Sequence, residues 1–261
     1  GRVDLYHDFV RANLESALGA TRVLAAHRRW IRFLDEAHPD AAERRVRHLL
    51  AVDDVAGAAT QARLAARRAE AQQAFGLAAD LFGVALRRPG QDEPSLLDAR
   101  ARALEGAARY PEAAQTWRRL VALSTGQEAM DASLAEAHAL LAADDVVGGH
   151  ARLNDTLDRA GEPRVGGRGF SGLLAAAAYS IGPRWRSPAL PKPSSRSPRL
   201  QDRADRDIRL GMLVGHFDPV SGVRFLRRAR AGFARAGAWE ETALCDNIFA
   251  YFALIGTRRP G

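Results

Sequence analysis

Two pairs of adjacent aspartates are the residues of this sequence whose types and spacing best suit chemistry, because paired carboxylates can bind a metal ion or exchange a proton. They stand in nearly the same phrase, LLAVDDVAGA at residues 49–58 and LLAADDVVGG at residues 140–149. In both copies they lie between an apolar helix end and the first turn expected of the next helix. There, an aspartate accepts hydrogen bonds from free backbone N–H groups. We predict that Asp54 and Asp145 are helix caps; a metal or catalytic site, which would need more converging carboxylates, is the alternative.

The other reactive side chains have no recognisable catalytic setting. The single lysine, Lys192, stands between two prolines, which excludes a P-loop and the ATP-binding lysine of a protein kinase. HExxH, CxxC and GxSxG motifs are absent from the sequence. An independent enzyme would need residues such as His138, His150 and Asp145 to meet in a polar cleft. We predict no catalytic, cofactor-binding or metal-binding residue, and a buried, inert cysteine, Cys245, in a reducing cytoplasm.

The net charge of +7 belongs to one segment of the chain. Between Arg164 and Leu200 there are seven basic residues and no acidic one, so the rest of the sequence is neutral. Because this segment is rich in proline and serine, we predict a basic linker over residues 164–202. A docking site for an acidic partner or an SH3-like domain at residues 188–193, phosphorylation at Ser187 and Ser197, and nucleic-acid contact are the alternatives. Nucleic acid is not the partner that we expect.

Residues 41–163 are predicted to form helix after helix, since they are rich in alanine, leucine, arginine and glutamate and are broken by short turn signals. Similar patterns recur at offsets of 35 and 36 residues, with small and large side chains on one helical face. Short connections make neighbouring helices antiparallel. The pattern predicts an all-α fold, an α-solenoid of antiparallel helical hairpins. The predicted packing positions are Phe75, Ala78, Phe82, Tyr110, Ala113, Trp117, Gly149 and Leu153.

The segment ARYPEAAQTWRRL at residues 108–120 resembles the second helix of the tetratricopeptide repeat. It carries the family's aromatic-x-x-Ala-x-x-x-aromatic core. At the first-helix positions Leu97, Ala101, Leu104 and Ala107, only the last residue matches the family, so these are divergent repeats. The resemblance implies a surface for binding proteins.

The two ends of the chain differ from the repeats. Residues 3–18, VDLYHDFVRANLESAL, resemble the end of the winged-helix segment of STAND-type ATPases, and we interpret His7-Asp8 there as a local junction. Residues 1–40 are therefore predicted to be a winged-helix remnant with connecting helices. Residues 203–261 are predicted to be a second, truncated helical block, with Asp218 as a helix cap. In this block an apolar stripe at helical spacing is predicted to be core: Trp239, Ala243, Leu244, Ile248, Phe252 and Ile255. An exposed apolar face is also expected at the end of the block.

In combination, these segments resemble the C-terminal region of large bacterial signalling proteins that carry a serine/threonine kinase and an AAA-type or STAND ATPase. The resemblance implies that the chain is a fragment of such a protein, that kinase or ATPase activity belongs to the parent, and that the fragment is not an enzyme. The expected partner is a protein or the parent's own ATPase or kinase domains, in the cytoplasm, without a membrane or a cofactor. The alternative is the repeat region of a STAND-type ATP-dependent transcription activator.

Overall fold

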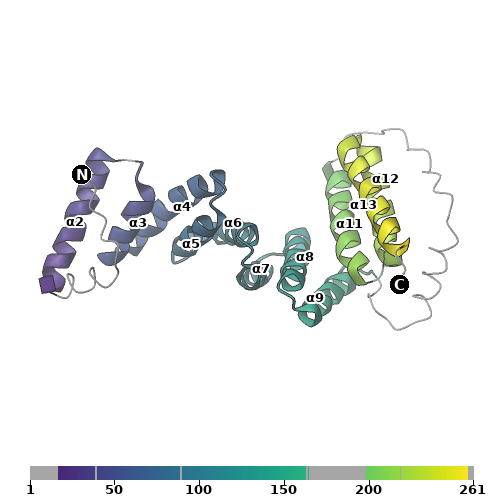
Figure 1. The fold of residues 1–261 in the computed structure, drawn as a ribbon, viewed down its shortest axis with the longest axis horizontal. Coiled ribbons are helices and arrows are strands. Elements are labelled where there is room, and N and C mark those ends of the chain that lie inside the picture. The colour runs from purple at the N-terminus through teal and green to yellow at the C-terminus, as the bar shows by residue number, and fades with distance from the viewer. Residues whose placement is uncertain are drawn as a thin grey trace. The chain divides into compact units, whose positions relative to one another are not determined.

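The computed structural model describes residues 17–38, 40–88, 90–162, 164, 198–217 and 219–257, with the backbone alone at 91, 216, 217, 219–221 and 250–257. Over these ranges the regular structure consists of eleven α-helices and one short 3₁₀-helix, without a strand (Figure 1). The prediction of an all-α protein is confirmed. A succession of helices joined by short turns is compatible with a helical-repeat array.

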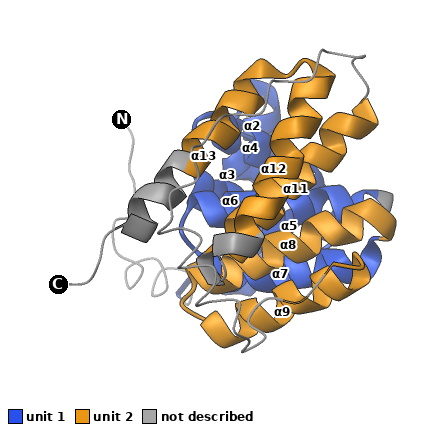
Figure 2. Ribbon diagram, turned by 90° about the vertical axis from the view of Figure 1, so that its right-hand side faces the viewer, with its two compact units in different colours: residues 1–124 blue, residues 125–261 orange. Residues whose placement is uncertain are grey.

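The chain divides into two compact units, Gly1–Ser124 and Thr125–Gly261 (Figure 2). The first contains α2 (Ala20–Ala37), α3 (Ala42–Ala51), α4 (Val55–Ala71), α5 (Phe75–Ala85), η1 (Gly90–Asp92), α6 (Glu93–Gly106) and α7 (Tyr110–Leu123). The second contains α8 (Gly126–Ala142), α9 (Val146–Arg159), α11 (Pro198–Phe217), α12 (Pro219–Ala236) and α13 (Trp239–Thr257). The boundary between the units falls inside the predicted 41–163 array.

Four of the turns between helices share one backbone geometry. In each, the residue after the helix C-cap has a positive φ, and the next residue donates its N–H to a carbonyl five residues back, as in a Schellman motif. The N–H donors are Asp54 to Leu49 (2.9 Å), Ala74 to Ala69 (2.8 Å), Arg109 to Leu104 (2.8 Å) and Asp145 to Leu140 (2.9 Å). Each donor is also the N-cap of the following helix. One residue therefore closes one helix and begins the next.

The positive-φ residues of these four turns are not glycines: they are Asp53, Gln73, Ala108 and Asp144. Replacing Ala108 (φ 56°) with glycine is expected to raise the free energy of unfolding by about 1 kcal/mol, because a Cβ is disfavoured in the left-handed region. Ala122→Gly, at an exposed position near the end of α7, should instead destabilise the protein by helix propensity. Urea unfolding measures the change in stability of each variant. The prediction is wrong if both variants become more stable or both become less stable.

Alanine dominates the core of unit 1. Six alanines of α4 are buried, so the neighbouring helices can approach its backbone closely; they are Ala58, Ala59, Ala62, Ala65, Ala66 and Ala69. Phe82, Leu97 and Leu104 are each at most 1% exposed and supply the bulky part of this core. Small and large side chains therefore share the interior of unit 1.

Unit 2 has two apolar clusters. One joins α8 and α9 to α11 and α12 and includes Leu134, Leu153, Leu210 and Phe225. The other joins α11, α12 and α13 and includes Ile208, Leu226, Phe233, Cys245 and Phe249.

Glycines set the contact between α11 and α12. A Cβ on Gly222 would stand 2.6 Å from the Cα of Gly215, and one on Gly232 would stand 2.8 Å from the Cβ of Ala204. The two helix backbones therefore touch, which no residue with a larger side chain at these positions would permit.

The predicted core stripe of α13 is wrong in part. Trp239 and Leu244 are about half exposed and Ala243 is exposed, whereas Cys245 and Phe249 are buried. Apolar residues surround this helix on several sides, so the sequence pattern does not select the face that packs. The side chains of Phe252 and Ile255, and the expected apolar end face, lie outside the described residues.

The predicted linker and the predicted N-terminal segment correspond only in part to described residues. Residues 198–202, which the sequence assigned to the linker, are the first turn of α11, and its first residue is a proline, which is well tolerated there. The rest of the predicted linker up to residue 197, apart from Arg164, lies outside the described residues. So do the predicted winged-helix remnant up to residue 16 and the cap Asp218.

Candidate functional site

The duplicated phrase forms the same joint twice. The carboxylates of Asp54 and Asp145 each accept a hydrogen bond of 2.8 Å, from the backbone N–H of Gly57 and of Gly148 respectively. A Cβ on either glycine would stand within 2.4 Å of the capping carboxylate, so the glycine leaves room for the cap. Among the described residues there is no group of three or more His, Cys, Asp or Glu placed to hold a metal ion.

The two aspartates of each pair therefore have different tasks, and this can be tested in the second copy. Asp145→Ala is expected to lower the free energy of unfolding by about 1 kcal/mol, because N–H groups of the first turn of α9 lose their acceptor. Asp144→Gly is expected to raise it by several tenths of a kcal/mol or more, because Asp144 has a φ of 64°. Thermal unfolding followed by circular dichroism gives both values. Equal losses in the two variants would indicate a shared carboxylate site instead.

The predicted packing positions occupy matching environments in α5, α7 and α9. The small residues Ala78, Ala113 and Gly149 are buried. The large residues four positions later, Phe82, Trp117 and Leu153, are buried as well; Phe75 and Tyr110, which begin their helices, are half-buried.

Contacts on the neighbouring helices show why small residues stand at some of these places. A Cβ built on Gly106 would lie only 2.8 Å from the ring of Phe75. A Cβ built on Gly149 would lie 2.6 Å from the side chain of Leu141. Trp117 donates its indole N–H to Glu105 over 2.9 Å.

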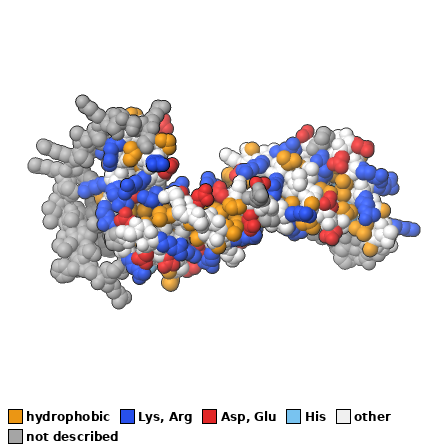
Figure 3. Space-filling view, turned by 180° about the vertical axis from the view of Figure 1, so that it is seen from behind, with side chains coloured by type: hydrophobic (Ala, Val, Ile, Leu, Met, Phe, Trp, Pro, Cys, Tyr) orange, Lys and Arg blue, Asp and Glu red, His pale blue; other side chains and the backbone are white. Residues whose placement is uncertain are grey.

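Ion pairs join the hairpins of unit 1. Arg109, in the turn between α6 and α7, donates to Asp80 of α5 and to Glu112 of α7, each over 2.7 Å. The hydrogen bond from Arg109 lowers the pKa of Glu112. Arg63 pairs with Asp92 over 2.8 Å, and Arg119 pairs with Glu93. Basic and acidic side chains are interspersed over the face drawn in Figure 3, as such pairing requires. No sequence motif signals these three pairs between helices, because their residues are 26 to 29 positions apart in the chain.

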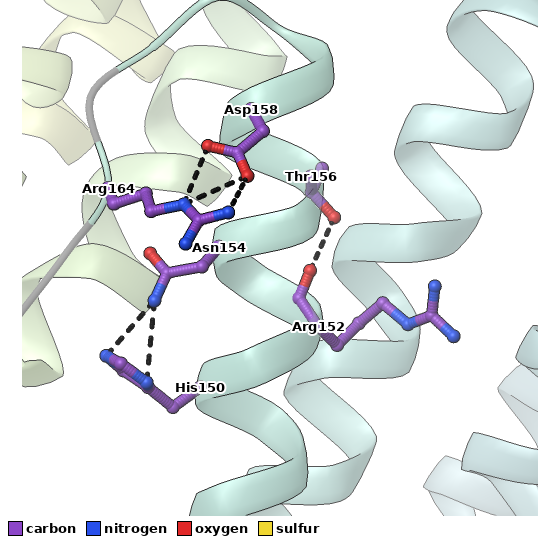
Figure 4. Close-up of polar contacts among 6 residues, drawn as sticks. All are labelled: His150, Arg152, Asn154, Thr156, Asp158 and Arg164. Atoms are coloured by element: carbon purple, nitrogen blue, oxygen red, sulfur yellow. Dashed lines mark hydrogen bonds and ion pairs between the residues drawn. The ribbon is translucent and has the colours of Figure 1, made fainter.

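The residues considered for an enzyme lie on α8, on α9 and at the turn between them. His138 is exposed on α8, and Asp145 is exposed at the start of α9. His150 lies on one side of α9, with the side-chain amide of Asn154 at 3.3 Å from its Nε2 (Figure 4). Further along α9, Asp158 forms an ion pair with Arg164, which lowers the pKa of Asp158. These are contacts between neighbours along the chain.

A buried polar pair between α8 and α9 was also missed. Glu136 is fully buried, and Arg152 reaches its two oxygens at 2.9 and 3.0 Å. Ser133 and Thr156 bond to each other over 2.7 Å nearby, and Thr156 also donates to the carbonyl of Arg152 (Figure 4). A sequence signal existed, because a glutamate and a serine interrupt the apolar face expected of α8. A buried pair of this kind is expected to favour one register of the two helices over others.

A surface on α2 and α3 gathers imidazole and aromatic rings. The Nδ1 atoms of His27 and His48 are 2.8 Å apart. The ring of Trp30 lies parallel to that of His48, at 4° and with centroids 5.9 Å apart, and Phe33 meets Trp30 edge-on. Trp30 is 51% exposed, and Phe33 is 47% exposed. We call His27, Trp30, Phe33 and His48 the imidazole–aromatic surface.

Acid is expected to loosen α2 from α3. Burial first, then the neighbours His27 and Arg47, lower the pKa of His48 below its ordinary 6.5. Because the folded state binds this proton less readily than the unfolded chain, the stabilisation is complete above pH 6.5 and is lost as the pH falls through that value toward the lower folded-state pKa. Hydrogen exchange of the α2 backbone, corrected for its intrinsic pH dependence, should accelerate over this window. In His48→Gln the acceleration should be much smaller; an identical profile would contradict the assignment.

The described helices include none that is both long enough and apolar enough to cross a membrane. No protein-family model and no curated protein sequence matches the chain.

Proposed function

We propose that the chain is a non-catalytic, tetratricopeptide-like region of a multidomain bacterial signalling protein with serine/threonine kinase and AAA-type or STAND ATPase domains. It binds a protein partner, or the parent's own ATPase or kinase domain, in the cytoplasm. Through this contact it regulates nucleotide-driven signalling. Catalysis belongs to the parent.

The observation that carries this proposal is the repeated joint. Four turns use the same hydrogen-bond geometry, and small residues lie buried at matching positions of α5, α7 and α9. Hairpins built alike present helix faces at regular intervals, which is how helical repeats bind extended or folded protein partners. The aspartates, the residues best suited to chemistry, serve as caps and turn residues, so they support a scaffold.

Partner binding is assigned to the first helices of the hairpins in unit 1. Leu64 of α4 is an apolar side chain that is 53% exposed, and Arg67 and Arg68 on the same helix are also exposed. Arginine is enriched at protein interfaces, and an exposed leucine beside two arginines offers a partner apolar contact and charge together. Leu77 of the second helix α5, 39% exposed, provides a matched control.

The experiment uses the reading frame that flanks this chain in its gene. The ATPase domain expected there is expressed separately, and its binding to this chain is measured by calorimetry together with its rate of ATP hydrolysis. Binding with a changed hydrolysis rate is expected. Leu64→Arg should weaken binding by about tenfold or more, while Leu77→Arg should leave it unchanged.

Three results would contradict the proposal or a part of it. If no neighbouring domain binds the chain and ATP hydrolysis does not respond to it, the regulatory role is wrong. If the flanking sequence encodes a helix-turn-helix domain instead of a kinase, the parent is a STAND-type transcription activator. If both leucine variants bind equally well, the partner uses another surface.

A further inference from the structure

The imidazole–aromatic surface holds two nitrogen ligands in a fixed relation. His27 comes from the middle of α2 and His48 from near the end of α3, and their Nδ1 atoms face each other at 2.8 Å. Trp30 stacks in parallel on the His48 ring, which limits its rotation. Without a ligand, one imidazole must donate its proton to the other across this distance.

The separation of the two nitrogens suits a particular coordination geometry. Nitrogen ligands of divalent transition metals lie about 2.0–2.1 Å from the ion, so two nitrogens 2.8 Å apart would subtend an angle of about 90°. A tetrahedral ion needs about 3.3 Å between such ligands, whereas neighbouring ligands in a square-planar or tetragonal complex need about 2.9 Å. Copper(II) and nickel(II) prefer the latter geometry with nitrogen and oxygen ligands.

We propose that His27 and His48 form a two-imidazole binding site for a divalent transition metal ion of tetragonal preference, copper(II) or nickel(II), that fastens α2 to α3. Both rings would bind through Nδ1, so the proton now shared between these atoms moves to an outer Nε2. The described residues place no third imidazole, thiolate or carboxylate in a ligand group with this pair, so water completes the coordination. Arg47, next to His48, opposes a bound cation and limits its affinity.

Binding at this place would matter because α2 is held mainly at its other end. Leu34 is the buried residue of α2, and Arg45 of α3 donates to the carbonyls of Leu34 and His38 there. The His27–His48 hydrogen bond lies nearer the start of α2. A metal ion that binds only the docked form stabilises it by mass action.

The test uses the whole chain, with nickel(II), copper(II) and zinc(II) as separate probes at about 100 µM and neutral pH. Calorimetry should detect one site that nickel and copper fill more tightly than zinc. Trypsin should cut more slowly after Arg28, Arg29 and Arg32 of α2 when nickel is present, relative to cuts elsewhere in the chain. The internal comparison corrects for any effect of the metal on trypsin.

The variants decide whether the ion binds at this pair. His27→Gln and His48→Gln should each weaken nickel binding at least tenfold and abolish the protection of α2, while circular dichroism verifies that they fold. His150→Gln, a histidine of α9, should retain both effects. Equal binding by His27→Gln and wild type, or loss in His150→Gln, would show adventitious binding and overturn the proposal. Tighter binding of zinc than of nickel would overturn the assigned geometry.

Discussion

Replacing Gly222 with valine is expected to lower the free energy of unfolding of unit 2 by about 3 kcal/mol. A Cβ at this position would stand 2.6 Å from the Cα of Gly215 and 2.8 Å from the carbonyl oxygen of Gly211. These are backbone atoms of α11, so no side chain can rotate away to make room. The helices must separate, and the apolar contacts around Leu226 and Phe225 separate with them.

The sign of the stability change caused by a smaller substitution, Gly222→Ala, distinguishes packing from helix propensity. Alanine favours a helix over glycine by about 1 kcal/mol, so propensity alone predicts that Gly222→Ala stabilises the protein. We expect destabilisation instead. Gly83→Ala in α5 is the matched control, because its Cβ would meet only Arg100 at an ordinary 3.5 Å, and it should stabilise. Hydrogen exchange reports local stability, so the rates in α11 and α12 measure unit 2 and the rates in α4 and α5 measure unit 1. Stabilisation by both alanines would refute the contact between backbones.

The sequence was sufficient to predict features that repeat locally. Apolar residues at helical spacing predicted the helices of residues 41–163, and the two aspartate phrases predicted a helix end followed directly by a helix start. The caps were readable because Asp54 and Asp145 act on N–H groups only three residues away. The residues that determine such a cap lie within one helical turn of each other in the sequence.

Features that join distant residues were not predictable in the same way. His27 and His48 are 21 residues apart on different helices, and neither stands in a motif that indicates the other. Ala108 takes a left-handed conformation without the glycine that usually signals it. The glycines of α11 and α12 offered a signal, since Gly211 and Gly215 are one turn apart, but their partner Gly222 depends on how the helices cross.

The second large effect is expected at Arg228, which joins three segments of unit 2. Its guanidinium donates to Glu162 after α9 and to Asp207 of α11, each over 2.6 Å, and lies 4.8 Å from the ring centre of Phe225. Asp207 is only 4% exposed, so removing its partner leaves a buried carboxylate uncompensated. Arg228→Met keeps the apolar stem and removes the charge. We expect a loss of about 2–3 kcal/mol, below the range for fully buried pairs because Arg228 is 37% exposed.

A second substitution shows whether the buried charge causes this loss. Replacing Asp207 with leucine in the Arg228→Met background removes the carboxylate that was left without a partner, so urea unfolding should show much of the stability restored. Arg235→Ala, on the exposed side of the same helix, should change stability by no more than about 0.5 kcal/mol. If Arg228→Met costs no more than Arg235→Ala, the ion pair does not hold the end of α9 on α11 and α12. If the double variant is less stable than Arg228→Met alone, Asp207 stabilises the unit through contacts other than Arg228.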